Sequence, residues 1–281
     1  MKLSVIIPAY NEATTIAQVV ERVLEVELDT VEKEIIIVND GSTDGTDVVL
    51  AALVARWPNG LAVTDPSLRR VEVCRKPPPQ TGETSPPRHS LKIVHHEQNR
   101  GKGAAIRTAL EHVTGDVVIT QDADLEYDPR EYPRLLAPFE DPAVQVVYGS
   151  RNLRRNPRSS WSFYWGGRLL SWIANLLYGS HITDEPTGYK VFRADLLRSL
   201  DLQSDGFEFC PEVTSKVLRR GIEIHEVPIS YRPRAFDEGK KINWRDGLWA
   251  IWTLLKYRLC PSPGGGSGSP RSPPHSTRPP A

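Results

Sequence analysis

Short apolar strands alternate with amphipathic helices in the first half of the chain, and this alternation constrains the fold more than any other feature. Apolar segments rich in β-branched residues occupy residues 3–7, 34–38, 91–94 and 117–120. The first three are each followed by a polar turn and then by apolar residues at helical spacing. Strands that alternate with helices pair in parallel, with the helices packed on the faces of the sheet. The pattern therefore predicts an α/β fold with a Rossmann-like, mostly parallel sheet flanked by helices.

Acidic residues follow the carboxyl ends of these predicted strands. Asp40 stands directly after the second strand, and Asp122 and Asp124 follow the fourth. Ligands of parallel sheets bind beyond the carboxyl ends of the strands, so we expect these three carboxylates to converge on one crevice. Asp44 lies further along its turn, where Asp is more typical of a cap before a helix.

The segment QDADLEYDP, residues 121–129, indicates the chemistry most directly. Asp122 and Asp124 are separated only by the small Ala123, and a turn at the strand end can bring both carboxylates to one point. Mg²⁺ and Mn²⁺ prefer such oxygen ligands and usually share them with substrate phosphates. A lone D-x-D triplet is more often a solvated turn. Its position among the other strand ends favours a metal–diphosphate site for a nucleotide-linked substrate.

Several motifs in a fixed order resemble those of family 2 glycosyltransferases with the GT-A fold. In the first half they are VIIPAYNE (5–12), EIIIVNDGSTDGT (34–46), NRGKGAAIRTAL (99–110), DVVITQDADLEYDP (116–129) and VVYGSR (146–151). In the second half they are TDEPTGYKVFR (183–193), GFEFCPEVTSKVLRRG (206–221) and EVPISYRPR (226–234). The second set is similar to the dolichyl- or polyprenyl-phosphate sugar synthase branch. The resemblance implies a GT-A domain over residues 1–233 with a Pro-rich insert at about 57–90.

The resemblance also implies a role for individual positions on the donor side. Nucleotide-binding positions are Pro8, Tyr10, Glu12, Asp40, Asp122 and Ala123. Metal-binding positions are Asp122, Asp124 and Glu126, with Asp124 the more direct ligand of Mg²⁺ or Mn²⁺. The implied catalytic set is Asp124, Arg151, Asp184, Arg234 and Lys240, in which the basic residues surround the phosphates.

The acceptor side leaves two chemistries open. By resemblance, the acceptor-phosphate positions are Arg151, Arg168 and Ser171, although Gly167 stands where some synthases carry a basic residue. A phosphate monoester is already an anion near neutral pH and needs no strong base, whereas a hydroxyl acceptor needs one. Asp184 and Glu185 are the candidates for such a base. With a lipid phosphate as acceptor, Asp184 would instead orient the acceptor or nearby basic side chains. The structural alternative is that Asp184 only caps the next turn.

The sequence predicts an inverting, metal-dependent glycosyltransferase that moves one sugar from a UDP- or GDP-sugar to a polyprenyl or dolichyl phosphate. One alternative is a soluble transferase that acts on a hydroxyl acceptor. The other is a non-catalytic nucleotide-sugar binding module, which the intact D-x-D disfavours because a binding module has no need of a metal pair. The net charge of zero gives no indication of nucleic-acid binding, and we expect none.

Basic and aromatic residues coincide in segments 151–178 and 244–258, a composition typical of membrane–water interfaces. The alternative for the first segment is a core helix beside a solvated basic turn. No window offers the about 20 apolar residues that span a bilayer, and no secretory signal opens the chain. We therefore expect a cytoplasmic protein resting on the inner face of the membrane, with an amphipathic helical segment at 234–260 and a disordered tail at 261–281.

Overall fold

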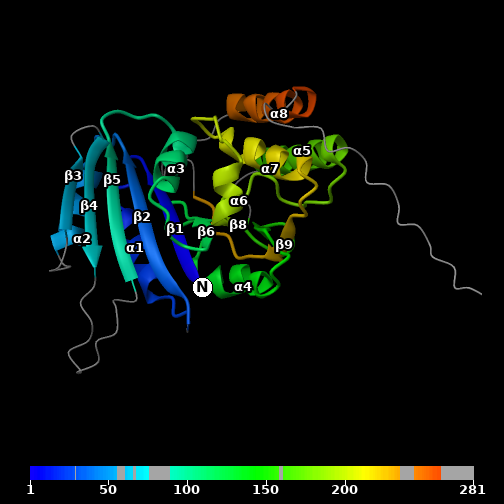
Figure 1. Ribbon diagram of the computed structural model, residues 1–281. Helices are drawn as coiled ribbons and strands as arrows, with labels where there is room; N and C mark the ends of the chain where they lie inside the picture. The colour runs from blue at the N-terminus through cyan, green and yellow to red at the C-terminus, as the bar shows by residue number, and fades with distance from the viewer. Residues whose placement is uncertain are drawn as a thin grey trace, which may run out of the picture.

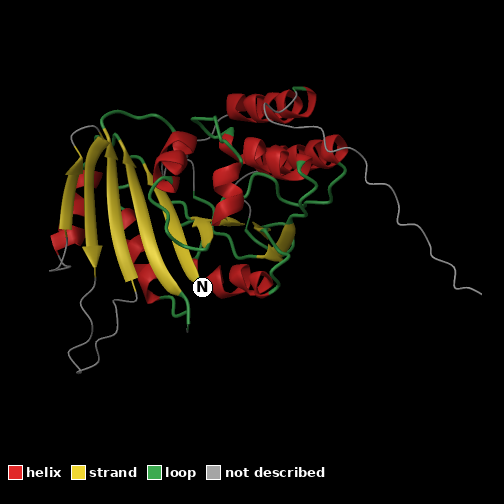
Figure 2. Ribbon diagram, viewed as in Figure 1, coloured by secondary structure: helices red, strands yellow, loops and turns green. Residues whose placement is uncertain are grey.

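The computed structural model describes residues 1–28, 30–55, 61–65, 68–75, 89–157, 161–234 and 244–260. The strands are β1 (Lys2–Ala9), β2 (Glu32–Asp40), β3 (Leu61–Asp65), β4 (Leu68–Arg75), β5 (His89–His96), β6 (Val117–Thr120), β7 (Val146–Ser150), β8 (Lys190–Arg193) and β9 (His225–Pro228). The α-helices are α1 (Ile16–Glu25), α2 (Thr46–Ala55), α3 (Lys102–Leu110), α4 (Tyr132–Leu136), α5 (Trp161–Tyr178), α6 (Ala194–Ser199), α7 (Phe209–Arg219) and α8 (Trp244–Leu259). Figures 1 and 2 show the strands as one twisted sheet with helices packed against it.

The centre of the sheet is parallel, as predicted. Strand order is β3-β4-β5-β2-β1-β6-β8-β7-β9, and β5, β2, β1 and β6 pair in parallel. Antiparallel pairs flank this centre, because β4 runs against β5 and β8 runs against both β6 and β7. The predicted α/β fold with a Rossmann-like parallel centre is confirmed, while the antiparallel flanks were not predicted from the strand–helix alternation.

Alternating side chains of β1 pack into two hydrophobic cores on opposite faces of the sheet. Leu3, Val5 and Ile7 pack in the core formed with α1, α2 and α4. Ile6 packs in the other core, formed with α3, α5, α6, α7 and α8. Both faces of a central parallel strand are buried, so β1 reads as a continuous apolar run. This packing fixes the carboxyl ends of β1, β2 and β6 beside one another.

Part of the predicted Pro-rich insert at about 57–90 extends the sheet. β4 lies within it and pairs antiparallel with β5. Its other antiparallel partner, β3, was not expected. Residues 56–60, 66–67 and 76–88 of the insert lie outside the described residues, as do Lys240 and the tail 261–281.

The helix expected within 234–260 is α8, which packs beside α5 and α7. The hydroxyl of Tyr178 on α5 donates to the carbonyl of Leu254 at 2.7 Å, and the hydroxyl of Tyr257 donates to Glu212 on α7 at 2.8 Å. Figure 1 shows α5, α7 and α8 stacked along one edge of the molecule. Within the part of the chain that the structure describes, no helix is both long enough and apolar enough to cross a bilayer.

Candidate active site

A cavity of about 1540 Å³ opens at the carboxyl ends of β1, β2 and β6. Six of the predicted nucleotide-binding residues line it: Pro8, Tyr10, Glu12, Asp40, Asp122 and Ala123. The other predicted residues that line it are Asp124, Glu126, Arg151, Asp184, Glu185 and Arg234. The strand ends of a parallel sheet thus converge on one cavity, as their positions in the sequence predicted.

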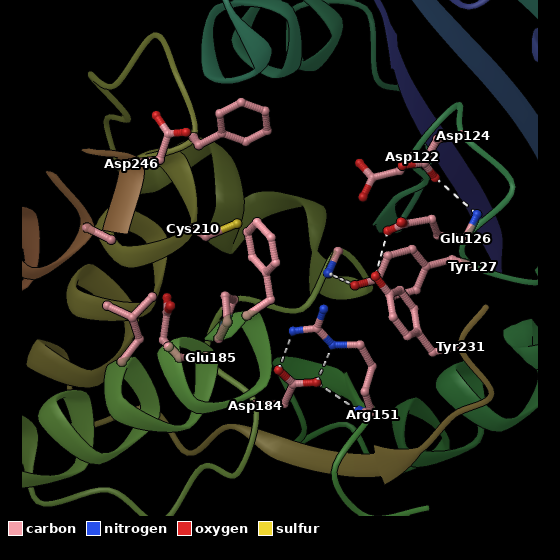
Figure 3. Close-up of a pocket in the computed structure, with 18 of the residues that line it drawn as sticks. Asp122, Asp124, Glu126, Tyr127, Arg151, Asp184, Glu185, Cys210, Tyr231 and Asp246 are labelled. Carbon is pink, nitrogen blue, oxygen red and sulfur yellow. Dashed lines mark hydrogen bonds and ion pairs between the residues drawn. The ribbon is translucent and has the colours of Figure 1, made fainter. Parts of the chain in front are cut away.

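The two carboxylates of the D-x-D segment lie in the turn after β6, and Figure 3 shows them together at one side of the cavity. The turn passes through Leu125 with a φ of +63°, and Asp124 Oδ1 accepts a hydrogen bond from the amide of Glu126 at 3.1 Å. Burial, then the negative charges of Asp122 and Glu126, raise the pKa of Asp124 to about 7. The carboxylates therefore repel one another in the absence of a cation.

This donor set fits Mg²⁺ or Mn²⁺, because it consists of carboxylate oxygens whose negative charge a cation would neutralise. Among the described residues, no group of three or more His, Cys, Asp or Glu side chains is arranged to hold a metal ion. A cation at Asp122 and Asp124 would therefore complete its ligands with substrate phosphate oxygens and water, as Mg²⁺ commonly does.

Lys102 is a residue of the site that the sequence interpretation missed. It is the first residue of α3, it lines the cavity, and its Nζ lies 2.5 Å from Asp122 Oδ1. Burial alone would lower the pKa of Lys102, but Asp122 outweighs this effect and raises the pKa above its usual value. The signal in the sequence was a lysine between two glycines, Gly101 and Gly103, at the end of the polar turn that follows the third predicted strand. A Cβ at Gly101, where φ is +96°, would lie 2.4 Å from the carbonyl oxygen of Asp205.

Asp40 fastens the loop that leads to Lys102. Its carboxylate is 3% exposed and accepts hydrogen bonds from the amides of Arg100 at 2.9 Å and Gly101 at 2.8 Å. The same carboxylate lies 2.6 Å from His96 Nδ1. The predicted contact of Asp40 with the nucleotide base stays a prediction, and the structure adds this structural function. Asp44 caps the turn before α2, as expected, by accepting a hydrogen bond from the amide of Thr46 at 3.0 Å.

The partly buried Arg151 and the buried Asp184 form an ion pair in the site (Figure 3). Arg151 donates to Asp184 through Nε at 2.7 Å, Nη2 at 2.7 Å and its backbone amide at 2.8 Å. Asp184 is 1% exposed, and its own amide donates to Glu226 at 3.0 Å. Burial would raise the pKa of Asp184, but Arg151 reverses the effect and holds the pKa below its usual value. Asp184 is thus an ionised residue that orients the Arg151 guanidinium.

Arg234 connects a segment far along the chain to the D-x-D turn. Its Nε donates to the carbonyl of Asp124 at 2.7 Å, and its Nη2 lies 2.9 Å from Glu12 Oε2. Glu126 accepts hydrogen bonds from the amide of Arg234 and from the hydroxyl of Tyr231, both at 2.7 Å. Both oxygens of Glu126 therefore hold this segment in place, and its predicted function as a metal ligand stays a prediction.

Arg168 and Ser171, two of the predicted acceptor-binding residues, are not among the residues that line the cavity. Arg168 is exposed on α5. Ser171 is buried, and its Oγ donates to the carbonyl of Gly167 at 3.0 Å and accepts from the amide of Glu185 at 2.9 Å. Ser171 thus braces the loop after Asp184, and acceptor binding by Arg168 and Ser171 stays a prediction. Lys240 lies outside the described residues.

Comparison with curated proteins finds several relatives, and the names of two of those described here contain a polyprenyl phosphate. Undecaprenyl-phosphate mannosyltransferase of Micrococcus luteus is 28% identical over 280 residues, which cover 92% of this chain and 99% of the relative. Dodecaprenyl-phosphate galacturonate synthase of Rhizobium johnstonii is 25% identical, and the match covers 83% of this chain and 60% of the relative. The low-salt glycan biosynthesis hexosyltransferase Agl6 of Haloferax volcanii is 28% identical, over 93% of this chain and 54% of the relative.

Solved structures share the fold. The UDP complex of glucosyl-3-phosphoglycerate synthase from Mycobacterium tuberculosis superposes with a TM-score of 0.63 at 20% identity, over 94% of this chain and 82% of that chain. At this identity the likeness concerns the fold, which is that of GT-A glycosyltransferases. Residues 4–77 and 83–201 match the family model described as Glycosyl transferase family 2. Because this match extends over more than half of the chain, the protein belongs to glycosyl transferase family 2 and is a glycosyltransferase.

Proposed function

We propose that the protein transfers one sugar from a UDP- or GDP-sugar to a polyprenyl phosphate, with inversion at the anomeric carbon and with Mg²⁺ or Mn²⁺ at Asp122 and Asp124. One observation carries the proposal: a single cavity connects these carboxylates with the apolar helices α5 and α8. Its volume of about 1540 Å³ exceeds the roughly 300–1,000 Å³ of common small-ligand pockets. Space of this size accommodates a nucleotide sugar together with the phosphate end of a lipid.

The end of the cavity toward α5 and α8 is suited to a hydrocarbon chain. Its lining there includes Trp161, Leu169 and Leu170 of α5 and Leu248 and Ile251 of α8. Apolar side chains on both helices would contact the first isoprene units of the acceptor. The relatives named for undecaprenyl and dodecaprenyl phosphate support the same class of acceptor.

Large apolar side chains also cover the outer surface of these two helices. On α5 they are Trp161, Trp165, Trp172 and Leu176, each between 61% and 68% exposed. On α8 they are Leu248, Trp249 and Trp252, each between 57% and 59% exposed. We call these seven residues the aromatic face. Exposed apolar surface of this kind, rich in Trp and beside the exposed Arg168, suits contact with a membrane surface. The face would rest on the inner side of the cell membrane, the localisation expected from the sequence.

The proposed reaction joins an acceptor phosphate oxygen to the anomeric carbon while the bond from that carbon to the donor diphosphate breaks. The nucleoside diphosphate leaves with the electron pair of the broken bond. A divalent cation, when bound, would neutralise charge on this leaving group. Lys102 and Arg234 lie beside the D-x-D turn and would donate charge-assisted hydrogen bonds to the diphosphate. Asp184 would hold Arg151 toward the acceptor phosphate.

Transfer to a hydroxyl acceptor is the competing function, and it requires a general base. The pairing of Asp184 with Arg151 and its lowered pKa make Asp184 a poor base. A phosphate acceptor needs no base, so this pairing supports the lipid-phosphate function and leaves Glu185 as the predicted base for a hydroxyl acceptor.

The test is a donor panel of UDP-glucose, UDP-galactose, UDP-N-acetylglucosamine and GDP-mannose. Each donor is incubated with undecaprenyl phosphate or with 3-phosphoglycerate, in Mg²⁺, Mn²⁺ or EDTA, and products are identified by mass spectrometry. We expect a glycosylated undecaprenyl phosphate from at least one donor, and none in EDTA. Faster glycosylation of 3-phosphoglycerate than of undecaprenyl phosphate by every active donor would contradict the proposal.

A further inference from the structure

Glu185 carries a buried carboxylate oxygen that the protein leaves without a partner. The residue is fully buried and lines the cavity. Its Oε1 accepts a hydrogen bond from the hydroxyl of Thr214 at 3.1 Å. Its Oε2 has no hydrogen-bond partner among the described residues. Buried polar atoms are nearly always paired in folded proteins, so this exception calls for a partner that enters the cavity.

The fold does not need the Glu185 carboxylate to hold its own loop. The backbone amide of Glu185 donates to Ser171 Oγ at 2.9 Å, and its carbonyl accepts from Lys190 Nζ at 2.5 Å. These bonds anchor the main chain on both sides of the residue. Leaving Oε2 unpaired lowers the stability of the fold. Proteins commonly keep destabilising groups of this kind at positions where a side chain contacts substrate.

The position of Glu185 limits which part of the substrates can contact its carboxylate. Figure 3 shows Glu185 near Asp184 and across the cavity from Asp122 and Asp124. The nucleotide and diphosphate of the proposed reaction lie at those two carboxylates, and a polyprenyl chain has no hydrogen-bond donor. The transferred sugar lies between the two phosphates and carries hydroxyl groups.

Resting on the proposed function, we propose that Glu185 is a specificity-determining residue whose Oε2 hydrogen-bonds a hydroxyl group of the transferred sugar. Burial raises the pKa of Glu185. A hydroxyl group pairs with either form of the side chain, because it can donate to a carboxylate and accept from a carboxylic acid. A phosphate would pair only with the protonated form. A site built to bind a hydroxyl rejects the analogue that lacks it, since the buried oxygen is again left unpaired.

The experiment compares the best donor of the panel with its 2-, 3-, 4- and 6-deoxy forms, using undecaprenyl phosphate as acceptor. In the wild type we expect one deoxy form to lose at least about tenfold in kcat/KM. Glu185→Met should lower kcat/KM for the parent donor by about 10- to 100-fold and should treat that deoxy form and the parent alike. The affinity for the free nucleoside diphosphate should stay within about twofold. The Tm should change little, because Met removes the unpaired oxygen, and the Thr214 hydroxyl, which loses Glu185 as acceptor, still lies 2.9 Å from the hydroxyl of Tyr148.

Glu226→Met is the matched control. Glu226 braces the same loop, but both of its oxygens accept amide hydrogen bonds, from Thr183 at 2.7 Å and Asp184 at 3.0 Å. This variant should lower the Tm and slow all donors equally. If Glu185→Met behaves in the same way, Glu185 is structural and the proposal is wrong. A loss of about 10²- to 10⁴-fold for every donor, together with loss of the acidic limb of the pH–rate profile, would make Glu185 a general base and would also overturn it.

Two further results remain informative. If Glu185→Met does not fold, Glu185→Gln replaces it, since Gln keeps the size and the contact with Thr214. The Gln variant should lose several-fold of the discrimination between parent and deoxy donor, and unchanged discrimination would refute the proposal. If undecaprenyl phosphate is not glycosylated at all, the proposed function fails, and the comparison is made with whichever acceptor, water included, takes the sugar.

Discussion

At the scale of single residues, the site depends on charges that lie close together. Asp122 and Asp124 share one turn, and the raised pKa of Asp124 reflects their burial and mutual repulsion. Asp184 shows the opposite behaviour because Arg151 lies within hydrogen-bond distance. Residues of the same type thus have different functions, set by the side chains that face them.

Asp124→Asn should remove most turnover and the metal-dependent part of nucleotide binding, because the amide is a far weaker ligand for a divalent cation. The fold should remain intact, since the substitution also relieves repulsion within the turn. Turnover and isothermal titration of UDP with and without Mn²⁺ would measure both effects. Asp128→Asn is the control: Asp128 belongs to the same segment but pairs with Arg130. Near wild-type turnover of Asp124→Asn at saturating Mg²⁺ would exclude the metal assignment.

Asp184→Asn should reduce stability at neutral pH by about 1.5–3 kcal/mol, because it removes the charge that accepts hydrogen bonds from the partly buried Arg151 guanidinium. The pKa of Asp184 is depressed in the folded state. Its contribution is therefore fully present above the unfolded pKa of about 4 and is lost as the pH falls through the lower folded pKa. Urea unfolding at pH 7 and at successively lower pH would measure this. The wild type and the variant should converge in stability in acid, and a constant difference at every pH would contradict the assignment.

At the scale of elements, the loop between β5 and α3 determines where Lys102 points. The Asp40 carboxylate holds the loop by accepting hydrogen bonds from backbone amides of the loop. Gly101 allows the loop to pass close to Asp205. The segment ending at Arg234 approaches from the other side and is held by Glu126. The D-x-D turn is therefore enclosed by two segments that are far apart in the sequence.

Gly101→Ala tests this arrangement. The new Cβ would lie 2.4 Å from the carbonyl oxygen of Asp205, so the loop must move and carry Lys102 away from Asp122. We expect UDP affinity to fall by about tenfold, equivalent to about 1.4 kcal/mol. Gly45→Ala is the matched control, because Gly45 has a similar φ of +90° but a Cβ added there would meet no atom within 4 Å. Gly45→Ala should lower the free energy of unfolding in urea by about 1–2 kcal/mol, because of left-handed backbone strain, and should keep the UDP affinity of the wild type. Equal UDP affinity in both variants would contradict this function of the loop.

At the scale of the whole molecule, the aromatic face adjoins the cavity, because two of its residues, Trp161 and Leu248, also line the cavity. A lipid phosphate keeps its charged group at headgroup level, so an enzyme that uses it must bring its cavity to that plane. Helices α5 and α8 present Trp side chains there, and α8 is held against α7 by Tyr257. The cavity and the surface proposed to bind membrane thus share the helices α5 and α8.

The protein should co-sediment with anionic liposomes, and the association should weaken as salt screens the surface charges. Replacing Trp249 and Trp252 by Ser should weaken liposome binding at least about tenfold, because both rings are more than half exposed and their burial in the interface is lost. Val48→Ser is the control, since Val48 is 67% exposed but lies on α2.

Arg151→Ala should separate turnover in the cavity from binding to liposomes by the aromatic face. It should lower turnover on undecaprenyl phosphate and leave liposome binding nearly unchanged, because Arg151 lies inside the cavity beside Asp184. Sedimentation and turnover would be measured on the same preparations. A wild type that does not associate with liposomes at any salt concentration would contradict the membrane proposal.

Three features could be predicted from the amino-acid pattern alone: the α/β fold, the parallel centre of the sheet and the strand ends that carry Asp40, Asp122 and Asp124. These features follow from local periodicity, because each strand and helix must bury its own apolar face. Only the tertiary structure decided the antiparallel position of β8, the pairing of Lys102 with Asp122 and of Arg151 with Asp184, and the unpaired oxygen of Glu185. Such partners depend on how distant loops meet after packing, and no spacing within the chain encodes the distance between their side chains.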